Sequence, residues 1–274
     1  MQTITLLNRK GGVGKTSSVF HLGGTLARGG RRVLVVDADP QANLTAGLLG
    51  ADVARELSAA ATIAALFDPD LDPFPEAVIR PTPVTGLSIL PGSAHLDTHN
   101  RPDPHEPGPH HGALRDFLTE VAGEFDLTLI DCPPTIYRAS WSALAASDHV
   151  VVPVQAEDFG SQGIVSILDA LETVRATVNP SLNLLGFLLT MFNKSLGVHA
   201  AYAEGLRRHY GDLVFTATMP LSKDYKEAVA ARKPIAVYKP RSAASKATQA
   251  LADELSTRIE AADSTVDVPN REVA

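Results

Sequence analysis

The sequence predicts an α/β fold, a doubly wound and mostly parallel sheet flanked by helices. Short apolar runs alternate with helical stretches along the 274 residues, which is the order of elements in such folds. Two of the runs, residues 33–36 and 150–152, are continuously apolar and rich in valine. Strands buried on both faces have this composition, and they belong to parallel sheets that helices cover.

Seven segments are expected as strands: residues 3–7, 32–37, 87–90, 127–131, 149–154, 184–191 and 213–216. Six segments are expected as helices: residues 15–28, 112–122, 137–146, 160–178, 199–210 and 242–259. The clearest helix is 160–178, because its apolar residues recur every three or four positions and Asn179-Pro180 ends the run.

The composition is that of a globular protein, with 45% hydrophobic and 20% charged residues. No apolar run is long enough to cross a bilayer, and the first residues lack the pattern of a signal peptide. The single cysteine, Cys132, excludes an internal disulfide or a cysteine-rich metal site. We therefore expect a cytoplasmic protein.

Two segments differ from the rest of the predicted single domain, which covers residues 1–260. Residues 95–111 hold five histidines and four prolines, and this much proline predicts a loop. The histidines lack helical or cysteine-paired spacing, so an exposed loop is preferred to a metal site. Residues 261–274 are polar without a period and are expected to form a disordered tail.

Charge is distributed unevenly along the chain. The net charge is −7, yet residues 191–246 contain ten basic and four acidic residues, a net charge of +6 that leaves −13 for the remainder. A basic section in an acidic protein indicates a face that binds anions.

A glycine-rich loop, Lys-Gly-Gly-Val-Gly-Lys-Thr at residues 10–16, lies between the first predicted strand and the first predicted helix. Glycines let backbone N–H groups approach phosphate oxygens, and the helix N-terminus attracts negative charge. In such a loop Lys15 reaches the β- and γ-phosphates, and the Thr16 hydroxyl ligates Mg²⁺. The remaining predicted phosphate contacts are Gly11, Gly12, Val13, Gly14 and Ser17.

This loop departs from the general phosphate-loop pattern, since Arg9 occupies the first glycine position and Lys10 follows it. It resembles the deviant Walker A loop of the ParA/MinD group of P-loop ATPases. The resemblance implies a P-loop NTPase domain that forms a homodimer with two ATP molecules between the subunits. It also implies that Lys10 reaches the partner's phosphates, whereas the group usually has Gly or Gln in place of Arg9.

Carboxylates follow two of the predicted strands, in Asp37-Ala38-Asp39-Pro40-Gln41 and in Asp131-Cys132-Pro133-Pro134. In doubly wound sheets, ligands bind beyond the carboxyl ends of strands. The segments resemble the two switch regions of the ParA/MinD group, which implies that Asp39 orients the attacking water, Asp37 supports the Mg²⁺ shell and Asp131 holds Mg²⁺. The predicted catalytic residues are therefore Lys10, Lys15 and Asp39, and the predicted metal residues are Thr16, Asp37 and Asp131.

The resemblance extends over about residues 1–258 and implies further contacts. Met219-Pro220 resembles part of the C-terminal section of the group, in which the residues after this proline line the adenine pocket, and this assigns Pro220 and Leu221. ParA proteins bind double-stranded DNA without sequence preference when dimerised by ATP, and a ParB-like partner stimulates their slow hydrolysis during chromosome or plasmid segregation. The basic section then supplies the candidate DNA contacts Lys194, Arg207, Arg208, Arg232, Lys233 and Arg241.

Other functions remain open at this stage. A MinD-like positioning ATPase needs a basic amphipathic C-terminal helix, but residues 263–274 are acidic and contain proline, so no membrane partner is expected. A non-hydrolysing nucleotide switch is opposed, though not excluded, by Asp39 and Asp131. A bridging iron–sulfur cluster, as in nitrogenase iron protein, needs two cysteines per chain, and only Cys132 is present.

Overall fold

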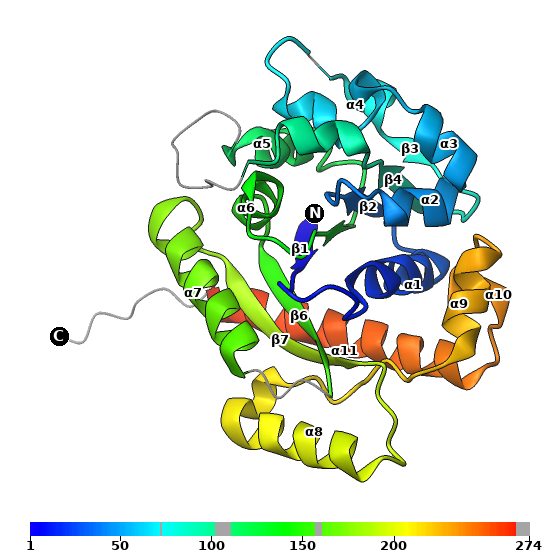
Figure 1. The fold of residues 1–274 in the computed structure, drawn as a ribbon, viewed down its shortest axis with the longest axis vertical. Coiled ribbons are helices and arrows are strands. Elements are labelled where there is room, and N and C mark those ends of the chain that lie inside the picture. Colours follow the sequence, from blue (N-terminus) through cyan, green and yellow to red (C-terminus); the bar gives the residue numbers. More distant parts are fainter. Residues whose placement is uncertain (72, 102–110, 157–160, 267–274) are drawn as a thin grey trace.

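The computed structural model describes residues 1–71, 73–101, 111–156 and 161–266 (Figure 1). Seven strands form one sheet in the order β3-β4-β2-β5-β1-β6-β7. Every neighbouring pair is parallel except β3 with β4, which is antiparallel. The doubly wound α/β fold predicted from the sequence is confirmed. The strands are β1 (Gln2–Leu6), β2 (Val33–Asp37), β3 (Arg80–Pro81), β4 (Leu87–Leu90), β5 (Leu127–Asp131), β6 (His149–Gln155) and β7 (Asn183–Thr190).

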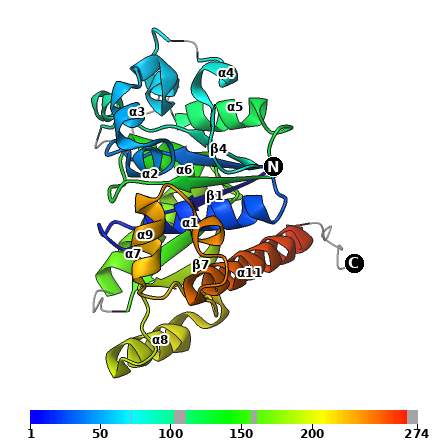
Figure 2. The same cartoon turned by 90° about the vertical axis from the view of Figure 1, so that its right-hand side faces the viewer.

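Helices connect the strands and cover both faces of the sheet (Figures 1 and 2). The described α-helices are α1 (Lys15–Arg28), α2 (Asn43–Leu49), α3 (Ala51–Glu56), α4 (Pro75–Val78), α5 (Ala113–Glu120), α6 (Arg138–Ala145), α7 (Ser161–Thr177), α8 (Gly197–Tyr210), α9 (Lys223–Ala230), α10 (Ile235–Tyr238) and α11 (Ala243–Val266). The described residues also form the short 3₁₀ helices η1 (Ala59–Ala61), η2 (Ile63–Phe67), η3 (Ala94–Thr98) and η5 (Gly211–Leu213). All six predicted helices are present, and α1 has the predicted bounds.

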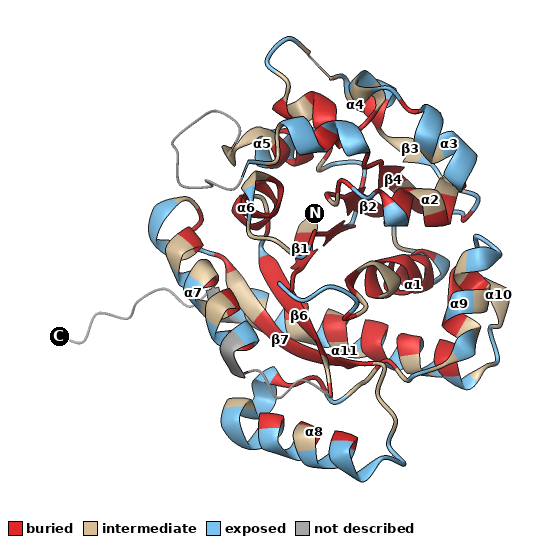
Figure 3. Cartoon of the chain, in the orientation of Figure 1, coloured by how far each residue is buried: buried red, intermediate tan, exposed pale blue. Residues whose placement is uncertain are grey.

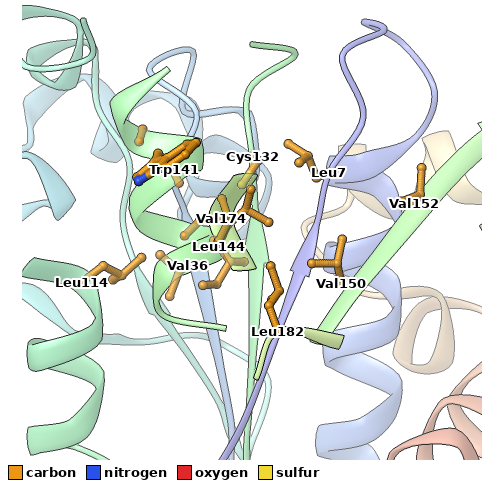
Figure 4. Close-up of a cluster of buried hydrophobic side chains, with 14 of the residues drawn as sticks. Leu7, Val36, Leu114, Cys132, Trp141, Leu144, Val150, Val152, Val174 and Leu182 are labelled. Atoms are coloured by element: carbon orange, nitrogen blue, oxygen red, sulfur yellow. The ribbon is translucent and has the colours of Figure 1, made fainter. Parts of the chain in front are cut away.

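Alternate residues of the strands face two separate hydrophobic clusters. Val36 and Val150 belong to the cluster that packs against α5, α6 and α7, and Figure 4 shows Val36 beside Leu144. Their neighbours Val35 and Val151 belong to the cluster on the other face, against α1 and α11. Figure 3 shows the resulting buried sheet and the buried α1. Burial on both faces explains why the strands read as continuous apolar runs.

The position of β1 places the glycine-rich loop where ligands bind in doubly wound sheets. β1 lies between β5 and β6. After β1 the chain builds β2, β3 and β4 on the β5 side of β1, and after β5 it crosses to build β6 and β7 on the opposite side. The order of the strands therefore reverses beside β1. Ligands bind at the carboxyl ends of the strands at such a reversal.

The strand predicted at residues 213–216 is wrong. Residues Gly211–Leu213 form η5, and Val214 makes only an isolated bridge to Phe187. The backbone groups that would extend a strand are bound by α11 instead, because Glu254 accepts hydrogen bonds from the N–H groups of Thr216 and Ala217 (2.9 and 2.7 Å).

The predicted disordered tail at residues 261–274 is wrong at its start. Helix α11 continues to Val266, so residues 261–266 are helical, and 267–274 lie outside the described residues. The predicted loop at 95–111 begins within η3, and its residues 102–110, which include His105 and His110, also lie outside the described part.

No described helix combines the length and the apolar character needed to cross a bilayer. Within the same residues, no three His, Cys, Asp or Glu side chains are grouped so that they could hold a metal ion.

Candidate nucleotide-binding site

The glycine-rich loop is fastened to the sheet by Asn8, the second residue after β1. The side-chain amide of Asn8 donates to the backbone oxygen of Pro153 in β6 (2.7 Å), and its Oδ1 accepts from the N–H of Lys10 (2.9 Å). Gly12 and Gly14 have φ angles of 77° and 85°, which glycine adopts without strain. The loop therefore has a fixed base and an open, exposed face at Gly11 and Gly12.

The Lys15 side chain is buried and spans the loop. Its ammonium donates to the backbone oxygens of Asn8 (2.9 Å) and Lys10 (3.1 Å). Burial lowers the pKa of Lys15, and the negative charge of Asp131 opposes this effect. An ammonium held in this way lies ready to bind anionic oxygens at the loop.

Thr190, at the end of β7, supports the loop from a distant part of the chain. Its hydroxyl donates to the backbone oxygen of Val13 (2.7 Å), and its side chain lies next to Gly14. Helix α1 follows directly, and Thr16 and Ser17 stand half-buried in its first turn. The hydrogen bond from Thr190 to the loop was not predicted, because it joins residues 177 positions apart.

Asp131 is a fully buried carboxylate at the end of β5. Neither oxygen accepts a hydrogen bond of normal geometry from the described residues. Burial raises the pKa of Asp131, the nearby Asp37 raises it further, and the Thr16 hydroxyl partly offsets both. Such a group is costly to bury unless a cation or donor satisfies it. Mg²⁺ bound by one carboxylate, the Thr16 hydroxyl, phosphates and waters fits these residues.

Asp37, at the end of β2, is already bound by the protein. Its Oδ2 accepts from the N–H (2.8 Å) and the hydroxyl (2.6 Å) of Thr45 in α2, and the Thr45 hydroxyl accepts from the N–H of Gly92 (2.8 Å). Burial raises the pKa of Asp37, and the Thr45 hydrogen bonds oppose this. Asp37 therefore ties α2 to the end of β2 beside Asp131, with which it is paired in register.

Asp39 lies two residues beyond β2 and is half-buried. Its Oδ1 accepts from the N–H of Gln41 (3.0 Å), which fixes a turn, and its charge acts on the Lys15 ammonium. Ala42 follows with a φ of 51°, a left-handed conformation uncommon for alanine. The structure thus brings Lys15, Asp37, Asp39 and Asp131 to one edge of the sheet, with Lys10 exposed at the same loop.

The two predicted adenine residues line one cavity of about 460 Å³, together with Phe192 and Asn193 from the end of β7. Phe192 is bridged to Pro220, and its oxygen accepts from the N–H of Leu221 (3.1 Å). Lys194 and Arg207, predicted as DNA contacts, line the same cavity. The cavity therefore combines an apolar wall with two cations.

The six candidate DNA contacts are all exposed but lie on different elements. Lys194 precedes α8, and Arg207 and Arg208 stand in its last turn, where Arg208 pairs with Glu204 (2.8 Å). The other three are Arg232 and Lys233, between α9 and α10, and Arg241, between α10 and α11.

Cys132 is fully buried within the second carboxylate segment, and burial raises the pKa of its thiol. A buried thiol of raised pKa is chemically inert, so Cys132 fills the core, where Figure 4 shows it between Leu7 and Trp141.

A strand, a glycine-rich loop and a helix, with a buried carboxylate on the neighbouring strand, define the P-loop class of nucleotide-binding proteins. The family model described as an AAA domain matches residues 1–184. The chromosome-partitioning ATPase Soj of Thermus thermophilus is 37% identical over 96% of this chain and 98% of its own length. The chromosome partitioning protein ParA of Caulobacter vibrioides is 33% identical over 94% and 95%. The chain belongs to this Soj/ParA family of chromosome-partitioning ATPases.

A solved structure with the same fold is cobyrinic acid a,c-diamide synthase from Mycobacterium smegmatis, which holds ADP and magnesium. It is 27% identical, with a TM-score of 0.78 over 95% of this chain and 96% of that chain. Its identity is lower than that of the two partitioning proteins.

Proposed function

We propose that this chain binds ATP and Mg²⁺, forms a homodimer with the nucleotides between the subunits, and then binds double-stranded DNA without sequence preference. Hydrolysis is slow until a ParB-like partner stimulates it, and the cycle drives segregation of a chromosome or plasmid at the nucleoid. We assign this activity to one ATPase domain over residues 1–260.

The observation that carries the proposal is the unsatisfied Asp131 carboxylate beside Lys15 and Thr16. A buried carboxylate, a buried ammonium and a hydroxyl at a glycine-rich loop are the groups that a metal-bound triphosphate requires. A purely structural aspartate would have donors of its own, as Asp37 has in Thr45.

Each residue then has a defined role in phosphoryl transfer to water. Mg²⁺, when bound, neutralises phosphate charge. The Lys15 ammonium binds the β- and γ-phosphate oxygens, and the loop N–H groups bind the remaining oxygens. Lys10, exposed at the loop, reaches the nucleotide of the second subunit. The Asp39 carboxylate accepts a hydrogen bond from the attacking water and orients it. We assign no separate general base to the attacking water, so we expect slow intrinsic turnover.

The test is ATP-dependent retardation of random duplex DNA in a gel, combined with the mass of the protein in solution. With ATP and Mg²⁺ we expect dimers and retarded DNA; with ADP we expect monomers and free DNA. A protein that stays monomeric with ATP, even when Asp39→Ala blocks cleavage, contradicts the proposal. Pelleting with liposomes in the presence of ATP would favour a MinD-like function instead.

A further inference from the structure

Arg232 contacts the end of the helix that follows the first carboxylate segment. A Cβ atom added at Gly50 would stand 2.7 Å from Nη1 and 3.1 Å from Cζ of Arg232. The guanidinium therefore lies directly against the backbone of Gly50, the residue that ends α2. Gly50 has a φ of 102°, which also favours glycine at this position.

Helix α2 joins this contact to the candidate nucleotide site. Its N-terminal end follows residues 39–42, and Thr45 in its first turn binds the Asp37 carboxylate. Its seven residues span about 10 Å at the usual rise of 1.5 Å per residue. Helix α2 therefore connects residues 39–42 to Gly50.

The contact lies at the junction of two helices, because Gly50 follows the last residue of α2 and precedes the first residue of α3. The partial charges of these two helix ends have opposite signs. The contact is therefore argued from the packing of the planar guanidinium against Gly50 and not from its charge.

The segment around Arg232 is held by other contacts. Pro234 lies directly against Gly24 of α1, and the N–H of Ile235 donates to Nδ1 of the buried His21 in α1 (3.1 Å). Val229 of α9 lies against Gly47 of α2. Figures 1 and 2 both show α9 beside α1 and α2. Arg232 thus extends from a platform built on the phosphate-loop helix.

The end of α9 holds the backbone of Arg232. Its φ is 55°, and the N–H groups of Arg232 and Lys233 donate to the backbone oxygens of Val229 (2.9 Å) and Ala228 (3.0 Å). This left-handed residue with its two hydrogen bonds is a common way for a helix to end. Arg232 therefore starts from a fixed position at the end of α9.

We propose that Arg232 is a positioning residue that holds the C-terminal end of α2 and couples residues 39–42 to the cationic segment 232–241. The contact with α2 stands by itself, while its effect on DNA binding rests on the proposed function. Arg232 then acts through α2, and not as a phosphate ligand of DNA.

The first test is hydrogen exchange of the backbone amides of residues 46–50 in the full chain without nucleotide. Arg232→Gly removes the guanidinium and adds no strain, because glycine adopts a φ of 55° freely. We expect exchange to accelerate between about 2-fold and 30-fold. Lys233→Ala, which removes the neighbouring exposed cation, is the matched control and should leave these amides unchanged. Unchanged exchange in Arg232→Gly, or equal acceleration in both variants, overturns the proposal.

The second test is the ratio of DNA affinities measured with ATP and with ADP. Arg232→Gly should lower this ratio between about 2-fold and 30-fold and leave the salt slope of binding unchanged. A phosphate ligand would instead lower the slope by about 1 and weaken binding in both states, which overturns the proposal. Arg232→Lys, which keeps the charge without the planar fork, should behave like Arg232→Gly. If the wild-type protein never binds DNA but Arg232→Gly still accelerates amide exchange, the proposed function is rejected and the contact between Arg232 and α2 is retained.

Discussion

The ammonium of Lys15 donates a hydrogen bond to the backbone oxygen of Lys10 at 3.1 Å, so the side chain of one lysine of the phosphate loop fixes the backbone of the other. Lys15 is buried within the loop, whereas Lys10 is exposed. In the proposed function, Lys15 binds the nucleotide of its own subunit and Lys10 binds that of the second subunit.

Lys15→Ala should lower ATP affinity by at least about 100-fold. In the proposed function the variant loses an ammonium that binds the β- and γ-phosphates, and each charge-assisted hydrogen bond contributes about 1.5–3 kcal/mol. Binding of a fluorescent ATP analogue measures the effect. Lys223→Ala, which removes a lysine that is 84% exposed, is the control and should bind ATP normally. Equal affinity in both variants would remove Lys15 from the site.

Asp39→Ala should retain ATP-dependent dimers and DNA binding and should lose turnover by about 100-fold or more, because the water loses its orienting carboxylate. Phosphate release and gel retardation measured on one preparation separate the two properties. Asp39→Asn keeps an acceptor for the N–H of Gln41. It therefore tests whether a loss of turnover comes from a disturbed turn or from the missing negative charge. Loss of dimers in Asp39→Asn would show that the assigned role is wrong.

The sequence predicted the long elements and the local motif, because their signals lie within a few residues. Helix α1 and the loop before it are contiguous, and both were located correctly. Helices α2 and α10 have seven and four residues, too few to show a clear helical period, and they were missed. Helix α9 was also missed, although its eight residues equal the length of α5 and α6.

The site residues that were missed act through distant contacts. Asn8 binds Pro153 and Thr190 binds Val13, across 145 and 177 residues respectively. The wrong prediction of a strand at residues 213–216 has the same cause, because Glu254 of α11 accepts a hydrogen bond from the backbone of this segment. Local patterns carry no information on partners of this kind.

Thr45→Val should destabilise the protein by about 1–3 kcal/mol, because it leaves the buried Asp37 oxygen and the Gly92 N–H without their hydroxyl partner. Urea unfolding measures the change. Thr45→Ser keeps the hydroxyl and should recover most of the stability. If Thr45→Ser is as unstable as Thr45→Val, then the methyl group and not the hydroxyl is important.

Arg241→Ala should reduce the slope of log affinity against log salt for duplex DNA by about 1, as expected for one lost phosphate contact. The measurement is a salt titration with ATP and random duplex. Arg32→Ala is the control: Arg32 is an exposed cation outside the basic section, paired with Asp126 at 2.6 Å. The proposed DNA face would be misplaced if Arg32→Ala changed the slope and Arg241→Ala did not.

His21 should make the protein less stable in mild acid. Burial lowers the pKa of His21 to about 3, and its Nδ1 accepts the N–H of Ile235. In the unfolded chain the same imidazole has a pKa of about 6.5. Between these values the unfolded state binds more protons, so stability is full above pH of about 6.5 and falls as the pH decreases toward 3, by up to about 1.4 kcal/mol per unit.

Urea unfolding at several pH values between 7.5 and 5 measures this slope, and His21→Asn supplies the reference because Asn Oδ1 can still accept from Ile235. Other groups titrate equally in both proteins, so the difference between the two slopes belongs to His21. The wild type should lose stability faster than the variant as the pH falls. Parallel slopes would mean that the imidazole is not held neutral in the folded protein, and that the junction of α1 with α10 is looser than the hydrogen bond indicates.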